Sequence, residues 1–220
     1  RRSTRIYAED SIPEDVIQRV VDAAQKAPNS SNLQCWELYR VNSPENKKRL
    51  VDACLGQPAA STASELFVLV ARPDLWRRNN AWTLAEFDRR GNMPERAYQY
   101  FTKITKIAYT QGPFAWVKRI WFPIRGLAQA TPREPIGWAD MRVWAHKSTA
   151  LSAAHFMLAM RAEGFDTCPM EGMDSRRVKS LLGLPSRAEI CMVVSAGRRT
   201  EKGVYGERYR FHRDSFYHER

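Results

Sequence analysis

Hydrophobic side chains recur at helical spacing near the start of the chain, and the pattern stops at Pro28. The motif Ser11-Ile12-Pro13-Glu14 predicts a capping box at the beginning of this helix, because proline is tolerated in a first turn. The apolar face that we expect to be buried comprises Val16, Ile17, Val20, Val21, Ala24 and Ala27.

Two short apolar runs, residues 36–41 and 66–71, have the length and the aromatic or branched side chains of strands. Between them, Ser43-Pro44-Glu45 opens a second helix, which we expect to stop at Gly56. The continuous hydrophobicity of the second run predicts a buried strand.

A long helix is predicted over residues 140–163, with Gly164 as its stop. Its apolar side belongs either to the core or to a dimer interface. A strand over 165–169, a helix capped by Asp174 and a last core strand over 190–196 follow. The residues predicted to face inward are Val143, Trp144, Leu151, Ala154, Leu158 and Ala159 on the long helix, and Val178, Leu181 and Leu182 on the shorter one, which ends at Gly183.

The pattern changes between residues 72 and 138, where tryptophans mix with arginines and prolines and only residues 94–109 predict a helix. We interpret this segment as an insertion or lid within a single domain that spans residues 1–220. The alternation of helices with few strands predicts an α+β fold, with helices on both faces of a mixed central sheet.

Composition narrows the possible functions. The chain has 220 residues and is 44% hydrophobic, which is enough for one substantial core. No apolar run approaches the ~20 residues of a membrane-spanning helix, so we expect no membrane insertion. Four cysteines without CxxC spacing favour a reducing cytoplasm, although a segment upstream of Arg1 would escape this reasoning. The net charge of +11 favours a phosphate-bearing partner, and FMN, NADPH, nucleic acid and an anionic membrane all satisfy it.

Arginines at both ends of the chain have a spacing that suits a phosphate. Arg1, Ser3 and Arg5 share one face of an extended chain and place two planar guanidinium groups beside a hydroxyl. Bidentate contacts from such groups to a phosphate monoester are strong and directional. Arg208 and Arg210 repeat the spacing, so three or four guanidinium groups would surround one dianion if the two ends meet. A pair of solvated termini is the alternative.

Two loops carry further candidate groups. The loop from Pro28 to Trp36 offers amides and hydroxyls to a heteroaromatic ring or a polyol, or else forms a turn that needs no ligand. At Glu171 and Gly172, a backbone amide between a strand and a capped helix either points into a cleft or belongs to a tight turn. The sequence lacks a GxGxxG fingerprint, a phosphate loop and a GxSxG elbow, and its histidines lack metal spacing. His155 is expected to be a packed core residue.

Taken in order, these motifs resemble the successive signatures of the nitroreductase family over nearly the whole chain outside residues 72–138. The resemblance implies an FMN-dependent α+β fold that forms an intertwined homodimer, with a flavin in each of two sites at the interface. The quoted motifs are Arg1-Arg2-Ser3-Thr4-Arg5, Ala27-Pro28-Asn29-Ser30-Ser31-Asn32-Leu33-Gln34-Cys35-Trp36, Pro169-Met170-Glu171-Gly172-Met173-Asp174, Leu182-Gly183-Leu184-Pro185 and Arg208-Tyr209-Arg210.

The resemblance also assigns expected roles to residues. It implies that the N-terminal residues hold the phosphate and the ribityl chain, and that the first loop lies along the isoalloxazine. A backbone amide of the second turn faces flavin N5. The tail contacts the phosphate again, and in such a dimer it reaches the partner's site. The corresponding residues are Arg1, Arg2, Ser3 and Arg5, then Pro28, Asn29, Ser30 and Asn32, then Pro169, Met170, Glu171 and Gly172, and finally Arg208 and Arg210.

Two positions depart from the family pattern. Members often place a basic or amide side chain near flavin N1 and the C2 carbonyl, but residues 56–60 contain no lysine, so Gln57 is the candidate. Stabilisation of a reduced, anionic flavin is therefore in doubt. Cys35 replaces the usual proline before the tryptophan, and packing is its simplest role.

The resulting hypothesis is a ping-pong enzyme that passes reducing equivalents from NADH or NADPH through flavin N5 to a small aromatic, quinone-like or nitro acceptor. A second hypothesis is a relative that consumes or sequesters flavin without conventional turnover. A third hypothesis is a basic module that binds nucleic acid or an acidic membrane through residues 114–125 and the tail. Charge is the only feature that supports this hypothesis, and we expect no nucleic-acid partner. The aromatic residues Phe114, Trp116, Trp121 and Phe122 either form a lid over the flavin or bury the dimer interface.

Overall fold

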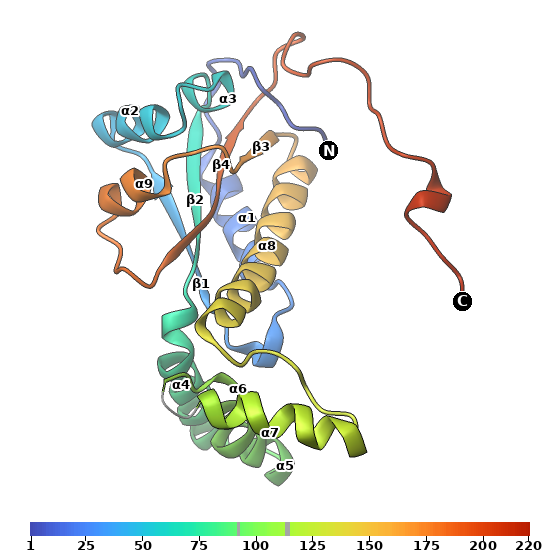
Figure 1. Cartoon of the computed structure of the whole chain (residues 1–220). Helices are drawn as coiled ribbons and strands as arrows, with labels where there is room; N and C mark the ends of the chain where they lie inside the picture. Colours follow the sequence, from blue (N-terminus) through green and yellow to red (C-terminus); the bar gives the residue numbers. More distant parts are fainter. Residues whose placement is uncertain (92, 113–114) are drawn as a thin grey trace.

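The computed structural model describes residues 1–91, 93–112 and 115–220. Within them, the strands β1 (Trp36–Val41), β2 (Glu65–Ala71), β3 (Asp166–Met170) and β4 (Glu189–Gly197) form a sheet in the order β1-β2-β4-β3 (Figure 1). Each neighbouring pair of strands is antiparallel. A parallel bridge between Ser3 and Thr167 adds the N-terminal segment to the free edge of β3 and gives this edge a mixed character. The α+β prediction is confirmed.

Helices cover both faces of the sheet, as Figure 1 shows. The helices α1 (Glu14–Gln25) and α8 (Trp138–Ala162) pack on the face that carries Phe67 and Leu69 of β2. The opposite face of β2 packs against α2 (Pro44–Ala53), α3 (Pro58–Ser61) and α9 (Ser175–Leu181). Because successive side chains of a strand point to opposite faces, a strand covered on both sides is hydrophobic throughout, and all residues of β2 are buried.

Helix boundaries follow local capping chemistry at two of the predicted positions. Ser43 Oγ accepts a hydrogen bond from the Asn46 amide at 3.3 Å, and the Asp174 carboxylate accepts from the first amides of α9. The predicted capping box of α1 is wrong, because α1 begins at Glu14 after Pro13 and has no side-chain cap. The Glu14 carboxylate instead accepts hydrogen bonds from Arg40 at 2.6 Å and Gln18 at 2.8 Å.

The rotation of α8 about its axis differs from the prediction. Val143, Leu151 and Leu158, predicted to face inward, are 50%, 43% and 60% exposed. The hydrophobic pattern selected the wrong face because several serine and threonine side chains of α8 are buried. They donate hydrogen bonds to backbone carbonyls, as Ser152 Oγ does to Ala24 O at 3.0 Å. His155 is exposed, not packed in the core, and its Nδ1 lies 2.9 Å from Leu151 O. The residues of α8 that are buried are Met141, Ala145, Ser148, Thr149, Ser152, Ala153, Phe156, Met157 and Met160.

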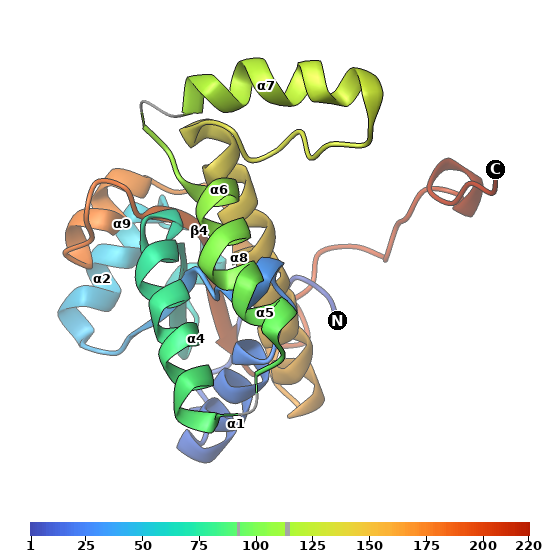
Figure 2. The same ribbon diagram turned by 90° about the horizontal axis from the view of Figure 1, so that it is seen from below.

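The helix predicted over residues 94–109 is present as a continuous helical run over residues 95–109, but the rest of the segment between β2 and α8 is also mostly helical, so the expectation of only one helix there is wrong. The segment contains α4 (Trp76–Arg90), α5 (Glu95–Gln99), a π-helical turn (Tyr100–Ile104), α6 (Thr105–Tyr109) and α7 (Ala115–Ala128). These helices, which we call the inserted helices because they lie between β2 and α8 in the sequence, lie beyond one end of the sheet, and α7 is set apart from the others (Figure 2). Their apolar periodicity is weak because the buried residues of α4 include Asn79 and Asn80, whose amides donate to backbone carbonyls.

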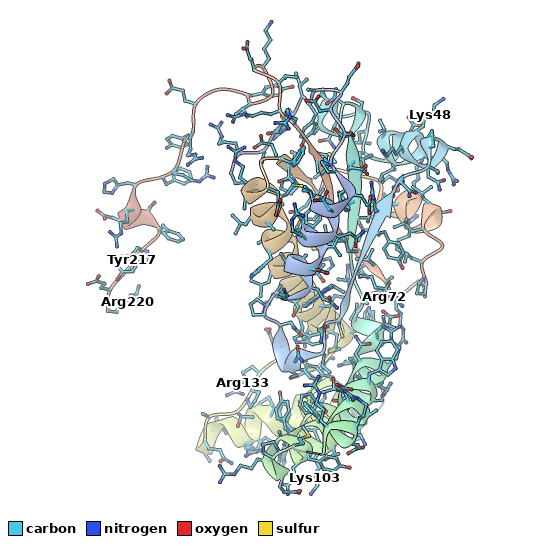
Figure 3. The ribbon with its side chains drawn as sticks, turned by 180° about the vertical axis from the view of Figure 1, so that it is seen from behind. Lys48, Arg72, Lys103, Arg133, Tyr217 and Arg220 are labelled. Carbon is cyan, nitrogen blue, oxygen red and sulfur yellow. The ribbon has the colours of Figure 1, made fainter. Side chains whose placement is uncertain are left out.

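The chain leaves β4 and returns along the N-terminal segment before it extends away from the body as an exposed tail (Figure 1). The tail carries a short 3₁₀ turn, Arg213–Ser215. Figure 3 shows Tyr217 and Arg220 well away from the sheet. Among the helices of the described ranges, none combines the length and the hydrophobicity needed to span a bilayer.

Candidate cofactor-binding site

The N-terminal segment is fixed in place by backbone pairing. The Thr4 amide donates to Thr167 O at 3.1 Å, and Tyr7 forms an antiparallel bridge with Arg199. The Tyr7 hydroxyl also lies 2.9 Å from Ser195 Oγ in the core, where burial raises the pKa of this phenol. The backbone of the segment therefore holds a defined position, whereas the side chains of Arg1 and Arg5 are exposed.

The segment that follows β4 packs directly against the N-terminal segment. The Arg5 amide donates to Gly203 O at 2.6 Å, and a side chain at Gly203 would place its Cβ 2.5 Å from Ile6 O. Glycine is thus required for this close approach. The Arg2 guanidinium donates to the carbonyls of Tyr205 and Gly206 at 3.4 and 3.2 Å, and Arg208 donates to Arg1 O at 3.3 Å. The N-terminal segment and residues 203–208 therefore meet, which is the condition that the sequence set for guanidinium groups from both segments to surround one dianion.

This meeting creates a small cavity of about 170 Å³, which we name the basic cluster. Among the described residues, its lining includes no carboxylate, so its guanidinium groups repel one another unless an anion lies between them. Planar guanidinium groups beside a hydroxyl fit the oxygens of a phosphate monoester, and the cavity has room for one. Arg208 contacts the N-terminal backbone and does not line the cavity. The lining residues are Arg1, Arg2, Ser3, Arg5, Tyr205 and Arg210.

The turn after β3 is held by the candidate amide side chain. Gln57 Nε2 donates to Gly172 O at 2.7 Å and to Cys54 O at 2.9 Å. The Asp174 amide also donates to Ala53 O at 2.8 Å, which fixes the turn to the end of α2. The structure thus brings together Gln57 and Gly172, which lie far apart in the sequence.

Glu171 and Gly172 are exposed, whereas the two residues before them belong to β3. Met170 is buried in the core between the sheet and α9, and Pro169 occupies an edge strand, where its missing N–H is tolerated. Glu171 lines a cavity of about 410 Å³ that also includes Arg142, His146 and Glu189. Burial lowers the pKa of His146. The turn therefore borders open space of a size that suits a ring system.

The loop after α1 makes internal contacts that the sequence did not predict. Ser30 Oγ lies 3.0 Å from the Tyr109 hydroxyl, and Ser31 Oγ lies 2.7 Å from the same group. Asn29 Oδ1 accepts from the Gln34 amide at 2.8 Å, while Pro28 and Asn32 are exposed. The inserted helices thus hold this loop, and no motif of the sequence signalled that contact.

One chain does not bring the first loop to the basic cluster. Leu33 and Cys35, which end the loop, pack against Met141 near the start of α8, whereas Ser3 pairs with Thr167 just after α8 ends. Because a helix rises 1.5 Å per residue, the segment from Met141 to the end of α8 spans about 30 Å. Figure 1 shows the N-terminus at one end of α8 and the inserted helices at the other.

Cys35 has a packing role, as expected. Its side chain is 1% exposed, and burial raises the pKa of the thiol to about 12, so the reactive thiolate is not formed near neutral pH. Of the aromatic residues proposed as a lid, Trp116 and Trp121 on α7 are exposed and Phe122 is partly buried. Phe114 lies outside the described residues.

Comparisons with known proteins agree with this architecture. A model of the nitroreductase family matches residues 1–198. A protein of Thermus thermophilus named NADH dehydrogenase is 30% identical over 208 residues, which cover 94% of this chain and 87% of that protein. The chain therefore belongs to the nitroreductase family.

Solved structures share the fold. The crystal structure of ydfN from Bacillus subtilis superposes with a TM-score of 0.81 at 22% identity and covers 100% of this chain and 95% of that one. A protein of Exiguobacterium sibiricum, solved in complex with FMN, gives a TM-score of 0.73 at 20% identity, with 100% and 93% of the two chains covered. At this level of identity, the likeness concerns the fold alone.

Proposed function

We propose that this protein is an FMN-dependent oxidoreductase that passes reducing equivalents from NADH or NADPH to an aromatic, quinone-like or nitro acceptor. The observation that carries the proposal is the basic cluster, where both ends of a family member's chain surround a phosphate-sized cavity that no described carboxylate lines. The complex of the Exiguobacterium protein with FMN supports the choice of flavin. The free thiols of all four cysteines are consistent with a reducing cytoplasm.

The residues near the cavity receive separate roles in this proposal. Arg1, Ser3, Arg5 and Arg210 bind the phosphate, and Arg2 supports them by holding the segment at Tyr205 and Gly206. Glu171 and Gly172 place a backbone amide at flavin N5, because Gln57 fixes the carbonyl of the same turn. When bound, the flavin supplies hydride transfer, so the side chains need only bind, orient and exclude water.

We propose further that the site is completed by a second copy of the chain. Pro28, Asn29, Ser30 and Asn32 lie at the far end of α8 from the basic cluster, so in one chain they do not reach a ring whose phosphate is bound there. The exposed apolar side of α8, which includes Val143 and Leu158, offers a surface for a symmetric dimer. In such a dimer, the loop of one copy meets the cluster of the other.

One observation favours the flavin-consuming alternative. Gln57 Nε2 donates to two backbone carbonyls, so its two N–H groups are engaged within the protein. This side chain therefore offers no free donor to stabilise negative charge on a reduced flavin. Anaerobic reduction followed by oxygen separates the two functions: a reductase recovers its isoalloxazine spectrum, whereas a flavin-consuming enzyme loses it irreversibly.

The proposed function is tested by spectroscopy. Purified protein incubated with FMN and desalted should be yellow, and NADH or NADPH should bleach the flavin absorbance under anaerobic conditions. Addition of a quinone or nitroaromatic acceptor should then restore the absorbance. Protein that does not retain FMN, while its circular dichroism shows a folded chain, would refute the proposal.

A further inference from the structure

The helix α7 has its apolar residues on the outside. Trp116, Trp121, Ile120 and Leu127 are 62%, 57%, 55% and 89% exposed. Its inner side carries Lys118, which is 8% exposed and whose ammonium group donates to Ala108 O at 3.0 Å and Thr110 O at 2.9 Å. Figure 2 shows this helix standing apart from the sheet. A helix that faces water has the opposite arrangement, so we infer that something apolar covers this side.

The exposed residues form one continuous stripe. At 100° per residue, the stripe occupies roughly 140° of the helix circumference. Arg119 borders the stripe on one side and Arg125 on the other, and the helix sequence AWVKRIWFPIRGLA contains no acidic residue. Tryptophans within an apolar stripe flanked by arginines are typical of helices that lie in the interface of a bilayer. The residues of the stripe are Trp116, Val117, Ile120, Trp121, Ile124 and Leu127.

The charge around α7 extends this pattern. From residue 96 to residue 133 the sequence has no aspartate or glutamate, although the whole chain has 24. Figure 3 places Lys103 and Arg133 at the same end of the molecule as the inserted helices. The stretch from residue 96 to residue 133, which includes α7, therefore combines exposed indole and aliphatic groups with basic residues and no acidic ones. The basic residues of this stretch are Arg96, Lys103, Lys106, Lys118, Arg119, Arg125 and Arg133.

Charge also distinguishes the two possible partners of the exposed side of α7, a second copy of the chain and an anionic lipid surface. Two copies of α7 packed face to face would bring Arg119 and Arg125 of one copy towards the same residues of the other, and α7 has no acidic residue to pair with them. A leaflet of anionic lipid attracts each lysine or arginine near its surface and accepts the indoles at the headgroup level. The exposed side of α8 already offers an apolar surface to a second copy. The composition of α7 thus fits a lipid surface better.

We propose that α7 docks this protein onto an anionic bilayer, with the Trp116–Leu127 stripe buried at the level of the headgroups and Arg119 and Arg125 against lipid phosphates. The helix lies along the surface and does not span it, in agreement with the absence of a spanning helix among the described residues. The proposal rests on α7 and does not depend on the proposed flavin chemistry.

Vesicle co-sedimentation of the full chain tests this docking. Binding should be strong to vesicles of phosphatidylglycerol and phosphatidylcholine, weak to phosphatidylcholine alone, and reduced by high salt. Arg119→Gln and Arg125→Gln should each weaken binding about fivefold. Trp121→Ser with Ile124→Ser should abolish it, while Trp82→Ser, which removes a tryptophan of α4 that is 61% exposed, should leave it unchanged.

Two results would overturn the proposal. One is equal sedimentation with anionic and neutral vesicles, or equal binding by the parent chain and the α7 variant. The other is a parent chain that ignores vesicles while the α7 substitutions lower its molar mass in analytical ultracentrifugation, since a second copy would then cover the stripe. The substituted side chains are exposed, so each variant should fold as the parent does, and circular dichroism checks this.

Discussion

The two ends of α8 differ in chemistry. Near its carboxyl end, the N-terminal segment and residues 205–210 line a positively charged cavity, and backbone pairing holds the N-terminal segment in place. At its amino end, the loop around Ser30 offers amides and hydroxyls, and the tyrosines of the inserted helices already bond to some of them. One end is suited to a phosphate and the other to the polar edge of a ring.

The comparison shows why one chain is insufficient for the proposed site. The span of α8 keeps the two chemistries about 30 Å apart, as estimated above from its helical rise. In the proposed dimer, a twofold axis perpendicular to α8 would pack the exposed sides of the two helices antiparallel, with the amino end of one copy near the carboxyl end of the other. The division of labour between the ends is therefore a testable property of the fold.

The largest expected effect comes from removing charge at the carboxyl end. Arg5→Ala should weaken FMN binding about 10- to 100-fold, because a charge-assisted hydrogen bond contributes about 1.5–3 kcal/mol. Fluorescence titration of the stripped protein with FMN measures the change. Arg89→Ala is the matched control, since its side chain is 70% exposed on α4, far from the cluster, and it should bind FMN as the parent does. If Arg5→Ala and the parent bound FMN with equal affinity, the phosphate would not bind at this end of α8.

A mixing experiment tests whether the two ends come from different copies. Ser30→Trp should block the ring end, while Ser31 keeps its contact with Tyr109. At an FMN concentration that fills the parent sites but not those of Arg5→Ala, neither Arg5→Ala nor Ser30→Trp alone should give a loaded site. Subunit exchange between them should restore about a quarter of the sites, because half of the dimers are mixed and each has one intact site of two. Flavin bleaching by NADH or NADPH counts the restored sites.

No recovery after verified exchange would place both ends of the site within one chain. Exchange itself is verified with two differently tagged copies, whose mixed dimers are isolated by sequential affinity steps. A mixture of the parent with Ser30→Trp serves as the control, because it retains parent dimers whichever arrangement holds.

The sequence pattern indicated the strands and the extended N-terminal segment for a common reason. Residues 66–71 are apolar throughout because both faces of β2 are covered, and Arg1, Ser3 and Arg5 alternate because the N-terminal segment is extended beside β3. In both cases the repeat of side-chain types along a few residues reflects surroundings that stay the same along the whole extended segment. Family motifs in their order then indicated which ligand such an environment suits.

The prediction failed where burial depends on distant partners. The buried face of α8 includes Ser148 and Thr149, so hydrophobicity alone selected the wrong side of the helix. The pattern did not predict α4 for the same reason, because its buried face includes Asn79 and Asn80, whose amides donate to carbonyls of other segments. The contact between Gln57 and Gly172 joins residues 115 positions apart, and no local pattern encodes it.

That contact gives the smallest expected effect. Gln57→Ala removes the donor to Gly172 O and leaves this exposed carbonyl to water, so the free energy of unfolding should fall by about 1 kcal/mol. Urea denaturation of the stripped protein measures this change. Gln18→Ala, which removes an exposed side chain of α1, should leave stability nearly unchanged and provides the comparison.

The same variant shows whether the turn belongs to the ring end of the site. If Gln57 positions the amide at Gly172, then Gln57→Ala should shift the flavin absorbance and reduction potential of the loaded protein, while FMN affinity falls only a few-fold. The phosphate contacts at Arg1 and Arg5 remain intact in this variant, so most of the binding free energy is retained. A loaded variant with an unchanged spectrum and potential would contradict the role of the turn, since its amide would then not face the ring.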